Sequence, residues 1–177
     1  MADTFKVDTA EFVAFYKALA QFDPELKKAL RKRLIDLAKP VVAEVKAAEL
    51  NLPSKGGEVE KTQLRKKKGA TLGFRASLAA ATKADFNGTG RGAVLHVRVS
   101  TSRFLAVSGR PRTLPYYMEG RRKREWRHPV FGNKNNWVGQ KPKPFLGEIV
   151  ARNKPAFAMA VEKAVNDVAT EIQHKIK

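Results

Sequence analysis

The chain has 177 residues, 43% of them hydrophobic, which is enough for one domain with a buried core. It carries 35 Lys and Arg against 17 Asp and Glu, a formal net charge of +18, and it has no cysteine. This composition excludes disulfides, thiol catalysis and cysteine-ligated metal centres, and no apolar run is long enough for a membrane span.

The excess positive charge lies in three segments. Residues 25–39 carry six basic against two acidic residues, residues 54–83 carry eight against two, and residues 110–143 carry ten against two. Together these differences account for the whole excess. Fields of this kind attract nucleic acid or acidic protein surfaces, and a solvated surface is the structural alternative.

Two amphipathic helices are predicted at the start of the chain. Apolar residues recur at spacings of three and four from Phe12 to Phe22, so residues 1–23 are expected to form an N-terminal helical extension. Asp23 and Pro24 then cap and open a second helix, whose apolar stripe reaches Val45. Pro40 is expected to kink this helix. Its opposite face carries Lys28, Arg31, Lys32 and Lys39.

Residues 51–72 are predicted to form a basic, flexible arm, because they contain Pro53, Gly56 and Gly57 and show no apolar period. The next segment, from Ala76 to Phe86, fits either a helix or a strand. A glycine-rich turn over residues 87–92 and clean alternation over Ala93–Val99 favour a β-hairpin. Phe104–Val107 and Trp126–Phe131 are weaker predicted strands.

A long amphipathic helix is predicted at the C-terminal end. Pro144 or Pro155 can open it, and its apolar stripe is Phe157, Val161, Val165, Val168 and Ile172. The predicted fold class is therefore α+β, with N-terminal helices, a central antiparallel sheet containing a β-hairpin, and a long C-terminal helix packed on the sheet. We expect residues 1–177 to form a single domain.

No pattern in the chain indicates catalysis. His96, His128 and His174 stand apart from one another and from carboxylates, so no metal site and no cofactor are expected. Glu119 and Glu125 lie in a basic loop, where pairing with arginine is the simplest role. The sequence therefore predicts a protein that is not an enzyme.

The segment from Tyr116 to Leu146 combines aromatic, proline, glycine and basic residues. Such residues can anchor a protein interface, or can stack on bases and contact phosphates, and we favour the interface. The predicted interface residues are Tyr116, Tyr117, Glu119, Trp126, Phe131, Trp137 and Phe145. The residues predicted to contact DNA or an acidic rim are Arg65, Lys66, Lys67, Lys68, Arg121, Arg122, Lys123, Arg124 and Arg127.

The order of motifs resembles the tail-completion or neck proteins of long-tailed phages, the family related to minor tail protein Z. The matching elements span about residues 25–177. The lysine-rich stretch after Pro53 departs from the family pattern, as does the first helix. The motifs that carry the resemblance are Phe74-Arg75-Ala76-Ser77-Leu78, the strand Ala93–Val99, Tyr116-Tyr117-Met118-Glu119-Gly120, His128-Pro129-Val130-Phe131-Gly132 and Pro142-Lys143-Pro144-Phe145-Leu146.

This resemblance implies a structural virion protein of the phage neck or tail, assembled in the host cytoplasm. It implies a ring, expected to be a homo-hexamer, between the head connector and the tail tube, with double-stranded DNA passing through the channel and no membrane contact. A tail terminator ring that caps the tail tube has a similar α+β plan and is one alternative. A non-specific DNA-binding protein is the other.

Overall fold

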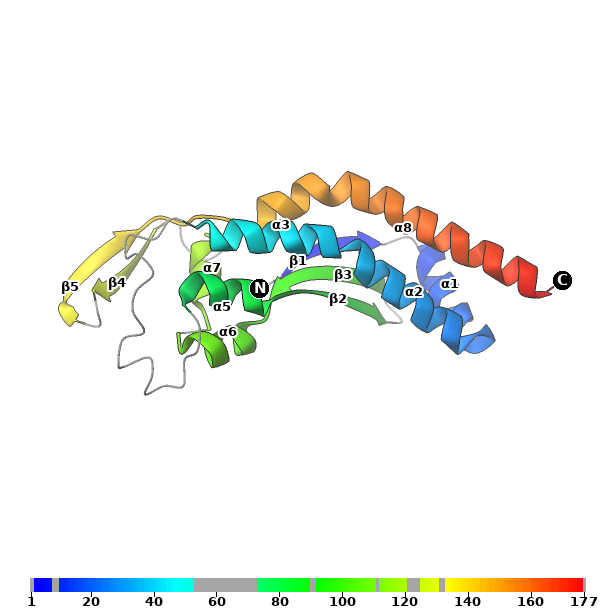
Figure 1. Cartoon of the computed structure of the whole chain (residues 1–177), viewed down its shortest axis with the longest axis horizontal. Helices are drawn as coiled ribbons and strands as arrows, with labels where there is room; N and C mark the ends of the chain where they lie inside the picture. Colours follow the sequence, from blue (N-terminus) through cyan, green and yellow to red (C-terminus); the bar gives the residue numbers. More distant parts are fainter. Residues whose placement is uncertain are drawn as a thin grey trace. The chain divides into compact units, whose positions relative to one another are not determined.

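The computed structural model describes residues 2–7, 10–52, 73–89, 92–110, 112–120, 125–130 and 133–176. The fold is α+β, as predicted, with N-terminal helices, an antiparallel sheet and a long C-terminal helix that packs on the sheet (Figure 1). In chain order the elements are β1 (Ala2–Val7), α1 (Ala10–Phe22), α2 (Pro24–Leu37), α3 (Lys39–Leu50), α5 (Phe74–Ala81), β2 (Thr82–Thr89), β3 (Gly92–Val99), α6 (Thr101–Ser108), α7 (Leu114–Met118), β4 (Trp126–Val130), β5 (Asn133–Gln140) and α8 (Gly147–Ile176).

The chain divides into two compact units, each assembled from stretches that are distant in sequence. We call one the sheet unit; it comprises Ala2–Ala43, Lys83–Arg98 and Ile149–Lys177. The other, the hairpin unit, comprises Glu44–Thr82 and Val99–Glu148. The predicted arm lies outside the described residues from position 53 onward. The single domain over residues 1–177 stays a prediction.

Helices α1 and α2 of the sheet unit meet at Asp23, which caps α2. The Asp23 carboxylate accepts a hydrogen bond from the Leu26 N–H at 3.0 Å, and Pro24 occupies the first helical position, as the sequence predicts. Tyr16 of α1 contacts Phe86 of β2 edge to face, with 5.4 Å between ring centroids, and so joins the helices to the sheet. The stripe that faces the core is Phe12, Tyr16, Leu19, Leu26, Leu30 and Leu34.

The sheet has the strand order β1-β3-β2. Strand β1 runs antiparallel to β3, with Ala2 opposite Arg98. Only residues 90 and 91 separate β2 from β3, a connection that only antiparallel neighbours can use, so this is the predicted hairpin. Leu95 and Val97 of β3 are buried and alternate with half-exposed neighbours, which gives the sheet one core face.

Strand β1 corrects one prediction, because Ala2–Val7 belongs to the sheet and not to a helical extension. The predicted disturbance at Pro40 is confirmed: α2 ends at Leu37, and α3 restarts at Lys39 with Pro40 in its first turn. The C-terminal helix is also confirmed. It begins at Gly147, shortly after Pro144, and continues through Pro155.

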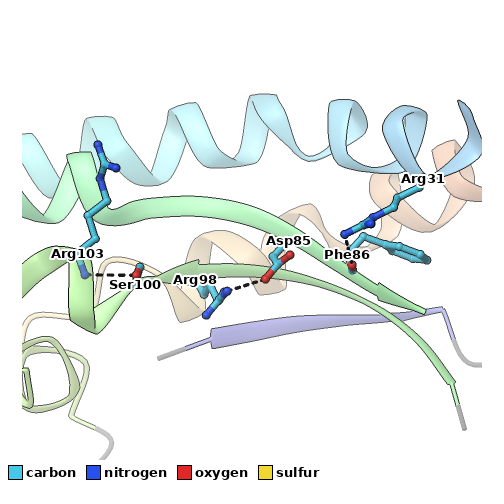
Figure 2. Close-up of polar contacts among 6 residues, drawn as sticks. All are labelled: Arg31, Asp85, Phe86, Arg98, Ser100 and Arg103. Carbon is cyan, nitrogen blue, oxygen red and sulfur yellow. Dashed lines mark hydrogen bonds and ion pairs between the residues drawn. The ribbon is translucent and has the colours of Figure 1, made fainter. Parts of the chain in front are cut away.

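The hairpin unit corrects two further predictions. Phe74–Ala81 is helix α5, and the strand begins only at Thr82, so the strand reading of Ala76–Phe86 is wrong over its first half. Thr101–Ser108 is helix α6, which replaces the weak strand predicted at Phe104–Val107. Ser100 caps α6 by accepting from the Arg103 N–H (Figure 2), and the two helices pack through Phe74 and Phe104, whose ring centroids lie 6.0 Å apart.

Candidate interaction site

Helix α7 carries the first three residues of the Tyr-Tyr-Met-Glu-Gly motif, and Glu119 and Gly120 follow its end. Pro115 stands at its start, where the fixed φ of proline suits a helix, and the Glu119 N–H donates to the Pro115 carbonyl at 3.1 Å. Gly120 follows with a φ of +72°, in the left-handed region that favours glycine. A Cβ at Gly120 would also stand 3.1 Å from the Cβ of Pro142. The final glycine of the motif is therefore required by backbone and by packing.

The Glu119 carboxylate fixes the start of α8. Its Oε1 accepts hydrogen bonds from the N–H groups of Phe145 at 2.6 Å and Leu146 at 2.7 Å, and Oε2 accepts from Gly147 at 3.3 Å. The first N–H groups of a helix have no partner inside it, and negative charge is favoured at that end. A second link joins the same segments, because the Lys143 N–H donates to the Met118 carbonyl at 2.8 Å.

These contacts correct the interface prediction at two residues. Glu119 is only 9% exposed and Phe145 only 3% exposed, so neither presents its side chain at the surface of the hairpin unit. The physical reason is that three backbone N–H groups outcompete a surface arginine as partners for a buried carboxylate. Tyr116 and Tyr117 are half-buried.

Strands β4 and β5 form a separate antiparallel hairpin in the same unit. The register places Trp126 opposite Gln140 and Pro129 opposite Trp137, with an irregularity after Pro129. The predicted strand at Trp126–Phe131 is thus confirmed as far as Val130, whereas β5 was not predicted. Every residue of β5 before Gln140 is exposed.

Two large apolar side chains stand on this exposed strand. Trp137 is 47% exposed and Val138 is 45% exposed. The indole Nε1 of Trp137 donates to the Lys134 carbonyl at 2.6 Å, which holds the ring in place. Tryptophan is enriched among the residues that dominate protein interfaces, and the interface role of Trp137 stays a prediction.

The other predicted contact residues are only partly described. Arg127 is exposed on β4. Trp126 has its backbone in β4, but its side chain lies outside the described part of the structure. Phe131 lies outside it entirely, as do the basic residues Arg65, Lys66, Lys67, Lys68, Arg121, Arg122, Lys123 and Arg124.

Two basic residues of α2 and the first residue of α3 are paired with acids of the same chain. Lys28 lies 2.6 Å from Glu25, and Lys39 lies 2.7 Å from Asp36. Arg33 lies 2.6 Å from Glu171 of α8. These exposed pairs add little stability, but they reduce the positive field that α2 offers to a polyanion.

Two more arginines of the sheet unit have structural contacts (Figure 2). Arg31 donates to the Phe86 carbonyl at 3.5 Å, and Arg98 lies 2.6 Å from Asp85 on the neighbouring strand. These two arginines therefore make contacts within the unit itself.

Sequence reasoning missed a buried polar pair in the hairpin unit. Glu49 of α3 is fully buried; its Oε1 lies 2.6 Å from the Thr82 hydroxyl, and its Oε2 has no hydrogen-bond partner among the described residues. Burial raises the pKa of Glu49 to about 7, and the negative charge of Glu119 adds to the rise. The Thr82 hydrogen bond and the Lys46 charge oppose it.

The Thr82 hydroxyl lies between two acceptor oxygens. It is 3.1 Å from the Leu78 carbonyl, and a hydroxyl has a single proton to donate. The Thr82 hydroxyl donates to the Glu49 carboxylate at 2.6 Å, which favours the charged form of Glu49 and so opposes the rise in its pKa. A sequence signal existed, since Glu49 continues the four-residue spacing of Val41 and Val45 on the buried stripe.

Within the described ranges, no three His, Cys, Asp or Glu side chains form a group that could hold a metal ion. No helix in that part of the chain is both long and apolar enough to cross a membrane.

Comparison with protein-family models, with curated proteins and with solved structures found no match for this chain.

Proposed function

We propose that this chain is a structural protein of the phage neck, forming a ring that joins the DNA-filled head connector to the tail tube. The observation that carries the proposal is the β4–β5 hairpin, which is exposed along β5 and bears Trp137. The hairpin belongs to the same unit as the buried Glu119 contacts. Aromatic and arginine side chains dominate the binding energy of protein interfaces, and an isolated two-stranded hairpin is only marginally stable. Both facts favour a hairpin that binds a partner protein and is stabilised by that contact.

The motif resemblance supplies the kind of assembly. Two of its motifs, Tyr116–Gly120 and Pro142–Leu146, are joined by the Glu119 hydrogen bonds across 26 residues of sequence. This supports reading them as one element of a fold and not as separate loops. In the proposed ring, hairpins of neighbouring subunits make head-to-tail contacts through Trp126, Phe131 and Trp137.

The net charge shapes how such a ring assembles. Six copies of a chain with a formal charge of +18 repel one another at short range, although screening at physiological salt limits each interaction to about 8 Å. We therefore expect the isolated protein to sediment as a monomer, and the ring to form on an acidic neighbouring ring or around DNA. A stable hexamer at low salt without DNA or partner would contradict this expectation.

The decisive experiment is an amber mutation in this gene in its phage, with the lysate examined by electron microscopy. Full heads beside separate tails of normal length are the expected result. Overlong tails would assign the protein to the tail terminators instead. Joined, infectious particles would overturn the structural role and leave non-specific DNA binding as the better reading.

A matched pair of variants tests the surface. Trp126→Ala with Trp137→Ala removes both predicted anchors and is expected to abolish ring formation on the neighbouring component. Lys154→Ala with Met159→Ala, two exposed positions on α8, is the control and is expected to assemble normally. Rings formed equally well by both double variants would show that the hairpin is not the interface.

A further inference from the structure

The β4–β5 hairpin has two outer edges, and a proline distinguishes them. Opposite residues in an antiparallel pair alternate between those that exchange two hydrogen bonds and those that exchange none. Pro129 lies opposite Trp137, and proline has no N–H to donate. Pro129 and Trp137 therefore form a non-hydrogen-bonded pair, and by alternation so do Arg127 and Gly139.

This alternation determines which backbone groups face outward. On β5, the N–H and C=O groups of Trp137 and Gly139 point away from β4. On β4, the outward position at residue 129 has no donor. The two-stranded sheet has no third strand among the residues that the structure describes, so the β5 edge is open to an added strand.

The exposed side chains of β5 suit an added strand. Trp137 and Val138 are neighbours and thus point to opposite faces, so a strand beside β5 would place side chains against both. The indole of Trp137 is already held by the Lys134 carbonyl, which reduces the entropy lost when a partner covers it.

The charge of this region selects the chemistry of the partner. The described residues 125–130 and 133–143 contain four basic residues and one acidic residue, all exposed: Arg127, Lys134, Lys141, Lys143 and Glu125. A second copy of β5 would bring like charges together, whereas an acidic segment would be attracted. We propose that the outer edge of β5 accepts an extended, acidic segment of another protein as an added strand. This inference does not depend on the neck function.

A pair of variants at Gly139 isolates the outward N–H. Gly139→Pro removes that donor while leaving the inward hydrogen bonds of Val138 and Gln140, and proline is tolerated on an edge strand in this orientation. Gly139→Ala is the matched control. A Cβ at this position meets only the end of the exposed Glu125 side chain, 2.5 Å from its Oε1, and that side chain can move.

The probe is a labelled peptide of alternating Val and Glu with the length of β5, 8 residues, and its binding to the full-length protein is measured by fluorescence anisotropy. We expect Gly139→Ala to bind like the wild type and Gly139→Pro to bind at least about tenfold more weakly. Equal binding by the two variants would overturn strand addition. Amide exchange at Val138 and Gln140, unchanged in Gly139→Pro, verifies that the hairpin is intact.

A second arm tests charge and distinguishes a second copy from an acidic partner. Arg127→Glu with Lys134→Glu should weaken the Val–Glu peptide and strengthen a Val–Lys peptide. Equal binding of both peptides by the wild type would overturn the acidic chemistry. Self-association of the wild type that is lost in Gly139→Pro and kept in Gly139→Ala would assign the edge to a second copy and overturn the proposal.

Discussion

The Glu119 motif and the β4–β5 hairpin come from one stretch of chain, and both contain aromatic, proline and glycine residues, yet their surroundings differ. Around Glu119 the backbone donors of residues 145–147 find a carboxylate inside the unit, and the apolar side chains beside them are buried. On β5 the outward donors and Trp137 meet no described partner strand. The difference teaches that composition alone does not separate a structural motif from a docking element. What separates them is whether the backbone N–H groups find acceptors inside the unit.

The largest expected effect is at Phe145, in the buried half of this comparison. Phe145→Ala should lower the free energy of unfolding by about 4 kcal/mol, because it removes a buried ring and leaves a cavity. Urea unfolding followed by circular dichroism measures it. A loss below about 1 kcal/mol would mean that residue 145 is not part of the core.

The next effect concerns Glu119. Glu119→Ala leaves the N–H groups of Phe145, Leu146 and Gly147 without an acceptor, and we expect a loss of about 3 kcal/mol. Glu119→Gln keeps one acceptor oxygen and should lose less. If both variants unfold like the wild type, the start of α8 is held by something other than this carboxylate.

Glu49 extends the comparison to a buried carboxyl without backbone donors. Its pKa is about 7 in the folded protein and near 4.5 when exposed, so the folded state binds the extra proton between these values. The contribution of Glu49 to stability is therefore greatest below pH 4.5, falls as the pH rises to about 7, and levels off above; the contribution lost is about 3 kcal/mol.

Glu49→Gln should remove this slope, because a neutral amide replaces the titrating group while it can still bond Thr82. Thermal unfolding between pH 5 and pH 8 measures the effect, and Glu148→Gln, at an exposed position on α8, is the control. The same slope in Glu49→Gln as in the wild type would assign it to another group.

The smallest effect belongs to the exposed half of the comparison. Trp137→Ala should change the free energy of unfolding by less than about 1 kcal/mol, since roughly half of the ring already faces solvent in the free chain. Its consequence should appear only when a partner is bound. A large loss of stability in the isolated protein would place Trp137 in the core and remove the contrast with Phe145.

The sequence predicted those helices and strands whose apolar pattern repeats over several residues. The stripe of α2 and the Asp23 cap, the alternation in β3, and the apolar face of α8 each follow from several residues in register. Helix α6 was wrongly predicted as a strand although the sequence marks both ends of the helix. Ser100 caps it, and Gly109, at a φ of +63°, ends it. Those end signals outweigh the strand preference of one Phe and one Val.

The site was less predictable because its contacts join distant segments. Glu119 reaches N–H groups 26 residues or more away, and Glu49 reaches Thr82 across 33. Charge and composition placed Glu119 at the surface, and only the closed structure shows three donors converging on it. The exposure of Trp137 was easier to predict because its own strand, and not a distant segment, determines it; its role as an interface residue stays a prediction.

Strand β1 has a consequence for how the protein is made. It pairs with β3, Ala2 lying opposite Arg98, so β1 has no partner strand until β3 (Gly92–Val99) has left the ribosome. Helices α1 and α2 also make local contacts with each other, such as the Asp23 cap, and these can form before β3 is made. During translation residues 2–7 therefore remain unpaired. Slow synthesis between α2 and β3 would lengthen the time in which another chain can pair with this segment.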